Sequence, residues 1–135
     1  MKPKVLIVDD DEEFTQLVEY NLGQQGCEII RARNGLEGLT RARSEMPDVI
    51  LLDILLPDLD GLAVCQILHA QPGTRGIPVF MLSALTEGFG GTRKRYAPFE
   101  IYFTKPVDFS LLGGTIRRAT QARHESLNSA SQKFH

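Results

Sequence analysis

Five short apolar runs recur along the chain, at residues 4–8, 27–32, 49–52, 77–82 and 99–103. The runs at 4–8 and 49–52 lack the alternation of a half-exposed strand, which is typical of strands buried on both faces of a parallel sheet. Segments with apolar residues at helical spacing separate them. This rhythm predicts an α/β fold in which a β-strand and an α-helix are repeated five times, giving a five-stranded parallel sheet with helices on both faces.

The predicted helices differ in strength. Asp11 is a suitable N-cap for the first helix, Pro47 ends the second, and the last begins near Asp108. Glycines in the segment 86–98 weaken a fourth helix there. The inward positions expected from helical spacing are Phe14, Leu17, Val18, Leu22, Leu36, Leu39, Ala42, Met46, Leu111, Leu112, Ile116 and Ala119.

One domain is expected at residues 1–123, followed by a polar tail or linker at 124–135. The 135 residues carry a formal net charge of -2, so no basic excess suggests that this domain binds nucleic acid directly. No apolar run approaches the ~20 residues that span a bilayer, and the start lacks a signal peptide, so no membrane association and a cytoplasmic location are expected. Cys27 and Cys65 are expected to be reduced and packed.

Polar residues follow the predicted strands closely: Asp9 and Asp10 after the first, Asp53 after the third, Ser83 after the fourth and Lys105 after the fifth. Carboxyl ends of parallel strands meet at one edge of a sheet, where ligands bind. Clustered carboxylates repel one another, and an all-oxygen set of this kind suits Mg²⁺. A carboxylate nucleophile beside a lysine and a hydroxyl is equipped to form an aspartyl phosphate. No Walker-type loop is present, so the phosphoryl donor must come from elsewhere.

Four motifs in order resemble the receiver domain of two-component response regulators. They are Val8-Asp9-Asp10, Leu52-Asp53 with Pro57-Asp58-Leu59-Asp60-Gly61, Leu82-Ser83-Ala84 and Thr104-Lys105-Pro106. The resemblance covers residues 4 to about 122 and implies a flavodoxin-like, doubly wound fold. It implies a non-enzymatic phosphoacceptor that catalyses only its own phosphorylation and dephosphorylation.

The resemblance also assigns roles. Asp53 would take the phosphoryl group from a sensor histidine kinase or a phosphotransfer protein, and Lys105, before a cis Pro106, would pair with that group. Mg²⁺ would be held by Asp9, Asp10, Asp53 and the backbone carbonyl of Leu55. Ser83 would hydrogen-bond a phosphoryl oxygen, and its movement would let Tyr102 turn inward. These two residues would form the switch, acting on an output face of the fourth helix, fifth strand and fifth helix. That face would bind a downstream effector or a second copy of the chain.

Two features depart from the family's usual pattern. Leu55 and Leu85 stand two residues after Asp53 and Ser83. In the family, by this resemblance, these positions flank the path of the hydrolytic water, and neither leucine side chain can hydrogen-bond a water. This predicts a long-lived phosphoryl state. The glycine-rich segment 86–98 is interpreted either as a switch that orders on phosphorylation or as a loose loop.

Two other function classes remain open. Asp58-Leu59-Asp60-Gly61 weakly resembles the nucleophile motif of haloacid-dehalogenase hydrolases, which would make the chain an Asp-based phosphatase. That motif requires its first aspartate at the end of an apolar strand, and here the strand ends five residues earlier. The other alternative is an interaction module that works without phosphorylation, which no residue specifically favours.

Overall fold

The strands form one parallel sheet in the computed structural model, which describes residues 2–84 and 101–133. They are β1 (Lys4–Val8), β2 (Glu28–Ala32), β3 (Val49–Asp53), β4 (Val79–Ser83) and β5 (Ile101–Thr104). Their order across the sheet is β2-β1-β3-β4-β5, and every neighbouring pair is parallel. The predicted five-stranded parallel sheet is therefore confirmed.

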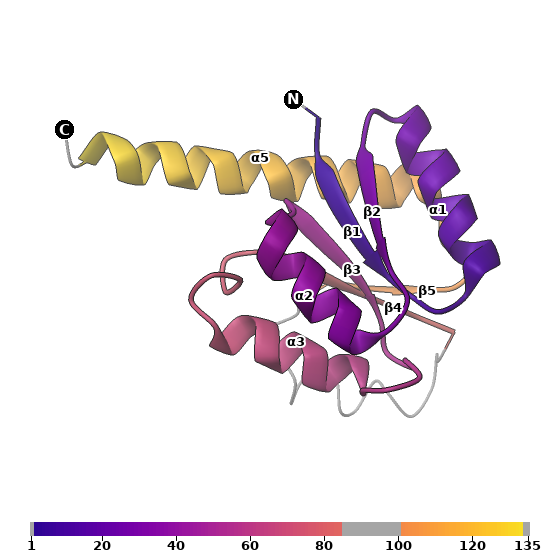
Figure 1. Ribbon diagram of the computed structural model, residues 1–135. Coiled ribbons are helices and arrows are strands. Elements are labelled where there is room, and N and C mark those ends of the chain that lie inside the picture. The colour runs from indigo at the N-terminus through magenta and orange to yellow at the C-terminus, as the bar shows by residue number, and fades with distance from the viewer. Residues whose placement is uncertain (1, 85–100, 134–135) are drawn as a thin grey trace.

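Within the described residues, four helices cover the two faces of this sheet (Figure 1). Helices α2 (Gly35–Glu45) and α3 (Gly61–Ala70) pack on one face, in a core cluster that includes Leu39, Val64 and Leu68. Helices α1 (Glu12–Gln24) and α5 (Phe109–Lys133) pack on the other. The helix expected within residues 86–98 lies outside the described residues.

The central strand β3 is buried along its whole length, and Ile50, Leu51 and Leu52 have no exposed surface. Alternate residues of this strand contribute to the two core clusters on opposite faces of the sheet. This double burial explains why the sequence shows an unbroken apolar run there rather than an alternating one.

Polar side chains fix the beginning of three helices. Asp11, Asn34 and Asp60 each accept a backbone N–H of the first turn of α1, α2 and α3 respectively. Such caps satisfy donors that have no partner within the helix. Helix α1 therefore begins where its predicted cap placed it, directly after the acidic end of β1.

The expected inward positions were wrong for Leu17, Leu36, Met46 and Leu111, which are at least half exposed. In α1 the buried apolar residues Phe14, Val18 and Leu22 recur every four residues, and Leu17 lies about 100° away around the helix. In α2 the close packing runs through Gly38, where a Cβ atom would meet the side chain of Val8. This approach leaves Leu36 on the outer side, and Met46 follows the helix as a left-handed C-cap.

Residues 124–133, expected as part of a polar tail or linker, instead belong to α5, which continues without a break to Lys133. No glycine or proline follows Gly114 in this helix, and alanine, glutamine, arginine and glutamate all favour helix. Arg123 also holds it to the sheet, donating from Nη1 to the carbonyl oxygen of Pro47 at 3.2 Å. His124 Nε2 lies 3.5 Å from Oδ1 of Asp48. Helix α5 consequently extends past the sheet in Figure 1.

Helices α1 and α5 meet at a close contact between Gln25 and Gly113. Nε2 of Gln25 donates to the carbonyl oxygen of Phe109 at 3.0 Å, and a Cβ atom at position 113 would overlap Oε1 of Gln25. The glycine therefore makes room for the side chain that ties α5 to the end of α1.

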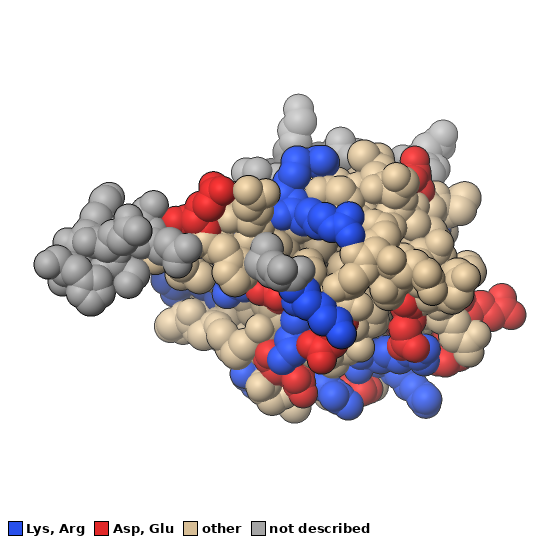
Figure 2. Space-filling view, turned by 90° about the horizontal axis from the view of Figure 1, so that it is seen from above, with Lys and Arg blue, Asp and Glu red and all other residues tan. Residues whose placement is uncertain are grey.

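The surface shows no dominant charge on the face drawn in Figure 2, where basic and acidic side chains are mixed. None of the helices in the described part of the chain combines the length and the hydropathy that a bilayer crossing requires.

Candidate functional site

The polar residues predicted to meet at the carboxyl edge of the sheet are brought together there. Asp9 follows β1, Asp53 and Ser83 end β3 and β4, and Lys105 follows β5. In the register of the sheet, Asp53 lies beside Leu82, and Ser83 lies beside Thr104. Asp9, Asp53 and Ser83 are 3%, 7% and 1% exposed, so their polar groups occupy a largely dry edge.

Three carboxylates form the centre of this edge. One oxygen each of Asp9, Asp10 and Asp53 lies within 4.8 Å of the others; Asp9 and Asp53 are buried and Asp10 is exposed. Hard oxygen donors at this separation fit a divalent cation such as Mg²⁺, which binds through one or two carboxylates and keeps several waters. The exposed position of Asp10 gives such waters a route to the cluster.

Lys105 supplies the positive charge beside these acids. Its Nζ donates to Oδ2 of Asp9 at 2.7 Å and lies 3.5 Å from Oδ2 of Asp53. The backbone N–H of Lys105 donates to the carbonyl oxygen of Ser83 at 2.9 Å, which fixes the loop after β5 against β4. The bond between Lys105 and Pro106 is cis, as the resemblance implied.

The electrostatics leave Asp53 as an unusual carboxyl group. Burial, followed by the charge of Asp9, raises the pKa of Asp53 to about 6, although Lys105 and the N–H of Leu55 act in the opposite direction. Burial alone would lower the pKa of Lys105, but its hydrogen bond to Asp9 and the charges of Asp9 and Asp53 raise it. The ammonium therefore stays charged, while the charged form of Asp53 is disfavoured by burial and by the charge of Asp9.

The loop after β3 is held close to the acceptor carboxylate. The N–H of Leu55 donates to Oδ1 of Asp53 at 3.3 Å, and the N–H of Gly61 donates to the carbonyl oxygen of Ile54 at 2.7 Å. A Cβ atom at position 61 would overlap the carbonyl oxygen of Asp53, so only glycine fits this approach. The Leu55 side chain is 60% exposed at the site. Leu85, its predicted counterpart, lies outside the described residues.

The two predicted switch residues lie on adjacent strands. Ser83 ends β4 at the acid cluster, and Tyr102 lies within β5, beside Met81 in the register. Tyr102 is partly buried and packs against the core cluster on the α2 and α3 side of the sheet. Tyr102 thus lies two residues before Thr104, the residue of β5 that pairs with Ser83.

Asp58 has a contact that the sequence did not predict. Its carboxylate accepts the N–H of Gly35 at 2.7 Å and of Leu36 at 3.0 Å, and so caps α2 from the loop after β3. The N–H groups of Leu36 and Gly35 lower the pKa of Asp58. This capping role occupies both oxygens of the residue that the phosphatase hypothesis needs as a nucleophile. The sequence showed only that an acid lies between Pro57 and Gly61, and this gave no indication that the acid would cap α2.

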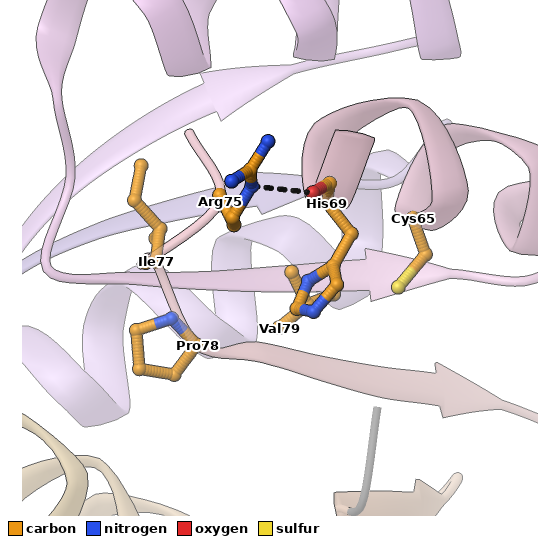
Figure 3. A pocket seen from close by; sticks show the side chains of 7 residues that line it. Cys65, His69, Arg75, Ile77, Pro78 and Val79 are labelled. Carbon is orange, nitrogen blue, oxygen red and sulfur yellow. Dashed lines mark hydrogen bonds between the residues drawn. The ribbon is translucent and has the colours of Figure 1, made fainter. Parts of the chain in front are cut away.

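A small hollow of about 160 Å³ lies at the opposite end of β4 (Figure 3). Its lining includes Cys65 and His69 of α3, Arg75 and Val79, the first residue of β4. Arg75 Nε donates to the backbone carbonyl of His69 at 3.3 Å, and the imidazole is exposed. Burial raises the pKa of Cys65 to about 11, which keeps its thiol protonated. The hollow is thus separate from the acid cluster.

The sequence matches a family model described as "Response regulator receiver domain" over residues 5–117. One relative is the alkaline phosphatase synthesis transcriptional regulatory protein PhoP of Bacillus subtilis, 41% identical over 106 residues; the match covers 78% of this chain and 43% of PhoP. Another is the polar-differentiation response regulator DivK of Brucella anthropi, 38% identical over 117 residues; it covers 87% of this chain and 95% of DivK. The chain thus spans less than half of PhoP but nearly all of DivK.

Solved structures give the same result for the fold. The receiver domain of the Francisella response regulator 1452 superposes with a TM-score of 0.80 and is 29% identical; the match covers 90% of this chain and 98% of that domain. The match therefore covers most of this chain and nearly all of that domain.

Proposed function

Since the chain belongs to the response regulator receiver domain family, we propose that Asp53 accepts a phosphoryl group from a phosphohistidine of a sensor histidine kinase or a phosphotransfer protein. The observation that carries this proposal is the pairing of a buried Asp53 carboxylate with the Asp9 and Asp10 oxygens within 4.8 Å and with the Lys105 ammonium at 3.5 Å. A nucleophile and its charge partners thus meet at one edge.

The acid cluster fits Mg²⁺, with Asp9, Asp10, Asp53 and the backbone carbonyl of Leu55 as its protein ligands. Bound there, the ion would supply positive charge that offsets the repulsion among the carboxylates and the charge of the incoming phosphoryl oxygens. The chain already meets part of this need itself, because Lys105 is paired with Asp9.

In the transfer, an oxygen of Asp53 attacks phosphorus in line with the scissile P–N bond. The new O–P bond forms as the P–N bond breaks, and the electron pair of that bond stays on the imidazole nitrogen of the donor, which is released as histidine. Lys105 and Ser83 hold the phosphoryl oxygens as charge shifts onto them. The domain acts only on its own phosphoryl group and is not an enzyme for an external substrate.

The phosphoryl state is read out through Ser83 and Tyr102 to an output face. That face contains β5 and α5, together with the fourth helix expected within residues 86–98, which lies outside the described residues. It binds a downstream effector or a second copy of the chain. Support comes from the direct pairing of β4 with β5 and from the packing of Tyr102 against the core. The site of action is the cytoplasm, and this domain itself does not contact nucleic acid or membrane.

The test is mass spectrometry of the chain after incubation with acetyl phosphate and Mg²⁺. We expect a mass increase of one phosphoryl group, absent in Asp53→Ala and retained in Asp58→Asn. Chelation of Mg²⁺ should prevent it. If the unmodified chain gains no phosphoryl group, or if Asp53→Ala still does, the assignment of Asp53 is wrong. Hydrolysis of a simple phosphomonoester that is lost in Asp58→Asn but kept in Asp53→Asn would instead support the phosphatase.

A further inference from the structure

The ammonium of Lys105 has an aromatic neighbour in addition to its acids. Its Nζ lies over the ring of Phe14, 4.3 Å from the ring centroid. A cation within about 6 Å of the face of an aromatic ring is attracted by the electron density of that face. Phe14 is 8% exposed, so this attraction operates in a largely water-free environment, where it is strongest.

The position of the ring is tied to the acid cluster through the start of α1. Oδ1 of Asp9 accepts the N–H of Asp11 at 2.9 Å, and Oδ1 of Asp11 accepts the N–H of Phe14 at 3.2 Å. These two hydrogen bonds fix the first turn of α1 relative to Asp9. The ring is consequently placed under Lys105 by the same residues that build the acidic edge.

The residues that contact the Lys105 ammonium differ in whether they take part in the reaction. In the proposed function, Asp9 binds the metal ion and Asp53 becomes phosphorylated, so both acids change their interactions with Lys105 during the reaction. The ring of Phe14 takes no part in either event. It is the contact of Lys105, among the described residues, that can persist through metal binding and phosphoryl transfer.

We propose that Phe14 is a positioning residue for Lys105: its aromatic face holds the ammonium at the acid cluster while Asp9 and Asp53 exchange partners. This inference rests on the proposed function and adds to it a specific role for the first turn of α1. It distinguishes Phe14 from a residue that only fills space in the core cluster shared by α1 and α5. A leucine at position 14 would retain apolar volume but lose the attraction for a cation.

The contact itself is measured by NMR on the metal-free, unphosphorylated chain labelled at lysine. Protons above a ring face are shifted upfield, so the ε-methylene signal of Lys105, assigned by its loss in Lys105→Arg, should lie upfield of the other lysine signals. Phe14→Leu should return it to their range, and Phe14→Tyr should keep it upfield. An unshifted Lys105 signal in the unmodified chain would overturn the proposal.

The consequence for the reaction is measured as the rate of phosphorylation by acetyl phosphate with saturating Mg²⁺. Phe14→Leu should slow it by about three- to tenfold, the range expected for loss of one such contact, and Phe14→Tyr should restore most of the rate. Phe80→Leu is the matched control, because Phe80 belongs to the same core cluster and packs against Phe103 instead. Its rate should stay near that of the unmodified chain.

A double-mutant cycle shows whether Phe14 acts through Lys105. In a Lys105→Met background, Phe14→Leu should slow phosphorylation no further. If Phe14→Leu reacts as fast as the unmodified chain, if Phe80→Leu is slowed equally, or if the two effects simply add, the positioning role is wrong while the proposed function stands. If the unmodified chain is not phosphorylated at all, the proposed function and the positioning role of Phe14 are both wrong.

Discussion

Nζ of Lys105 lies 2.7 Å from Oδ2 of Asp9, in an ion pair that joins the loop after β5 to the end of β1. Asp53, at 3.5 Å, is the more distant partner of the same ammonium. The positive charge is therefore directed mainly at Asp9, while burial and then the charge of Asp9 raise the pKa of Asp53 to about 6.

Removing the charge of Asp53 should stabilise the metal-free protein at neutral pH. The pKa of Asp53 is about 6 in the folded chain against an ordinary 3.8, so between these values the folded state holds a proton that the unfolded state releases. The contribution of Asp53 to the stability of the folded chain therefore falls as pH rises through this window. Asp53→Asn does not titrate, and its free energy of unfolding at pH 8 should be about 1–3 kcal/mol higher.

The measurement is urea unfolding in EDTA from pH 4 to pH 8. The advantage of Asp53→Asn should be small at pH 4, grow up to about pH 6 and then stay constant. Glu13→Gln, an exposed acid in the first turn of α1, should give no gain. An advantage that is independent of pH would contradict this explanation.

Gly61→Ala should be strongly destabilising, by about 3 kcal/mol or more, because the new methyl group would overlap the backbone at Asp53 and Ile54. Rigid backbone cannot move aside as a side-chain end can. Gly73→Ala is the control, since a Cβ atom there meets nothing within 4 Å. Thermal and urea unfolding of both variants decide the matter, and equal losses would show that the close approach is not the cause.

The two glycines of α5 should respond differently to alanine. Gly114→Ala should stabilise by about 0.5–1 kcal/mol through helix propensity, because its Cβ atom would meet only the end of the Arg118 side chain. Gly113→Ala should gain less, because it displaces Gln25 and breaks that side chain's bond to Phe109. In a Gln25→Ala background the gain from Gly113→Ala should approach that from Gly114→Ala. Equal gains at both positions in the unmodified chain would exclude the steric explanation.

Loss of the phosphoryl group should accelerate when a polar side chain replaces Leu55. This leucine is 60% exposed, its backbone N–H donates to Oδ1 of Asp53, and its side chain cannot orient a water for attack on phosphorus. Leu55→Asn combined with Leu85→Glu should shorten the phosphoryl lifetime by up to about tenfold, within the range that positioning of reacting groups can contribute. Mass spectrometry over time measures this. Leu36→Asn, an equally exposed leucine on α2, should have no effect, and an unchanged lifetime in the double variant would refute the idea.

The strands and the acid cluster could be predicted because their signals are local. Residues 4–8 form β1 as expected, and the run beginning at Val49 ends on Asp53 as β3 does. Once these strands are parallel, their carboxyl ends must share one edge, so the meeting of Asp9, Asp53, Ser83 and Lys105 follows from topology. To place each of these residues at the edge, one needs to know only where its strand ends.

Contacts between distant elements could not be predicted in the same way. Two such contacts are the ring of Phe14 under Lys105 and the cap that Asp58 provides for α2. Both depend on how the helices pack on the sheet, and the spacing of residues along the sequence does not reveal this packing. Leu17 and Leu111 have helical spacing, yet the buried stripes of α1 and α5 are too narrow to include them. The continuation of α5 was missed because a polar helix and a polar linker have similar compositions.

The length of helix α5 allows a small rotation at one end to become a displacement at the other. At 1.5 Å per residue, its 25 residues make a rod of about 37 Å. The hydrogen bond from Arg123 to the Pro47 carbonyl lies partway along this rod, so a rotation of the helix about this contact would move its two ends in opposite directions. If the part of α5 that packs on the sheet tilted by about 5°, the part after Arg123 would move by roughly an ångström at its end. Pro47, which precedes β3, would then mark the point about which the helix turns.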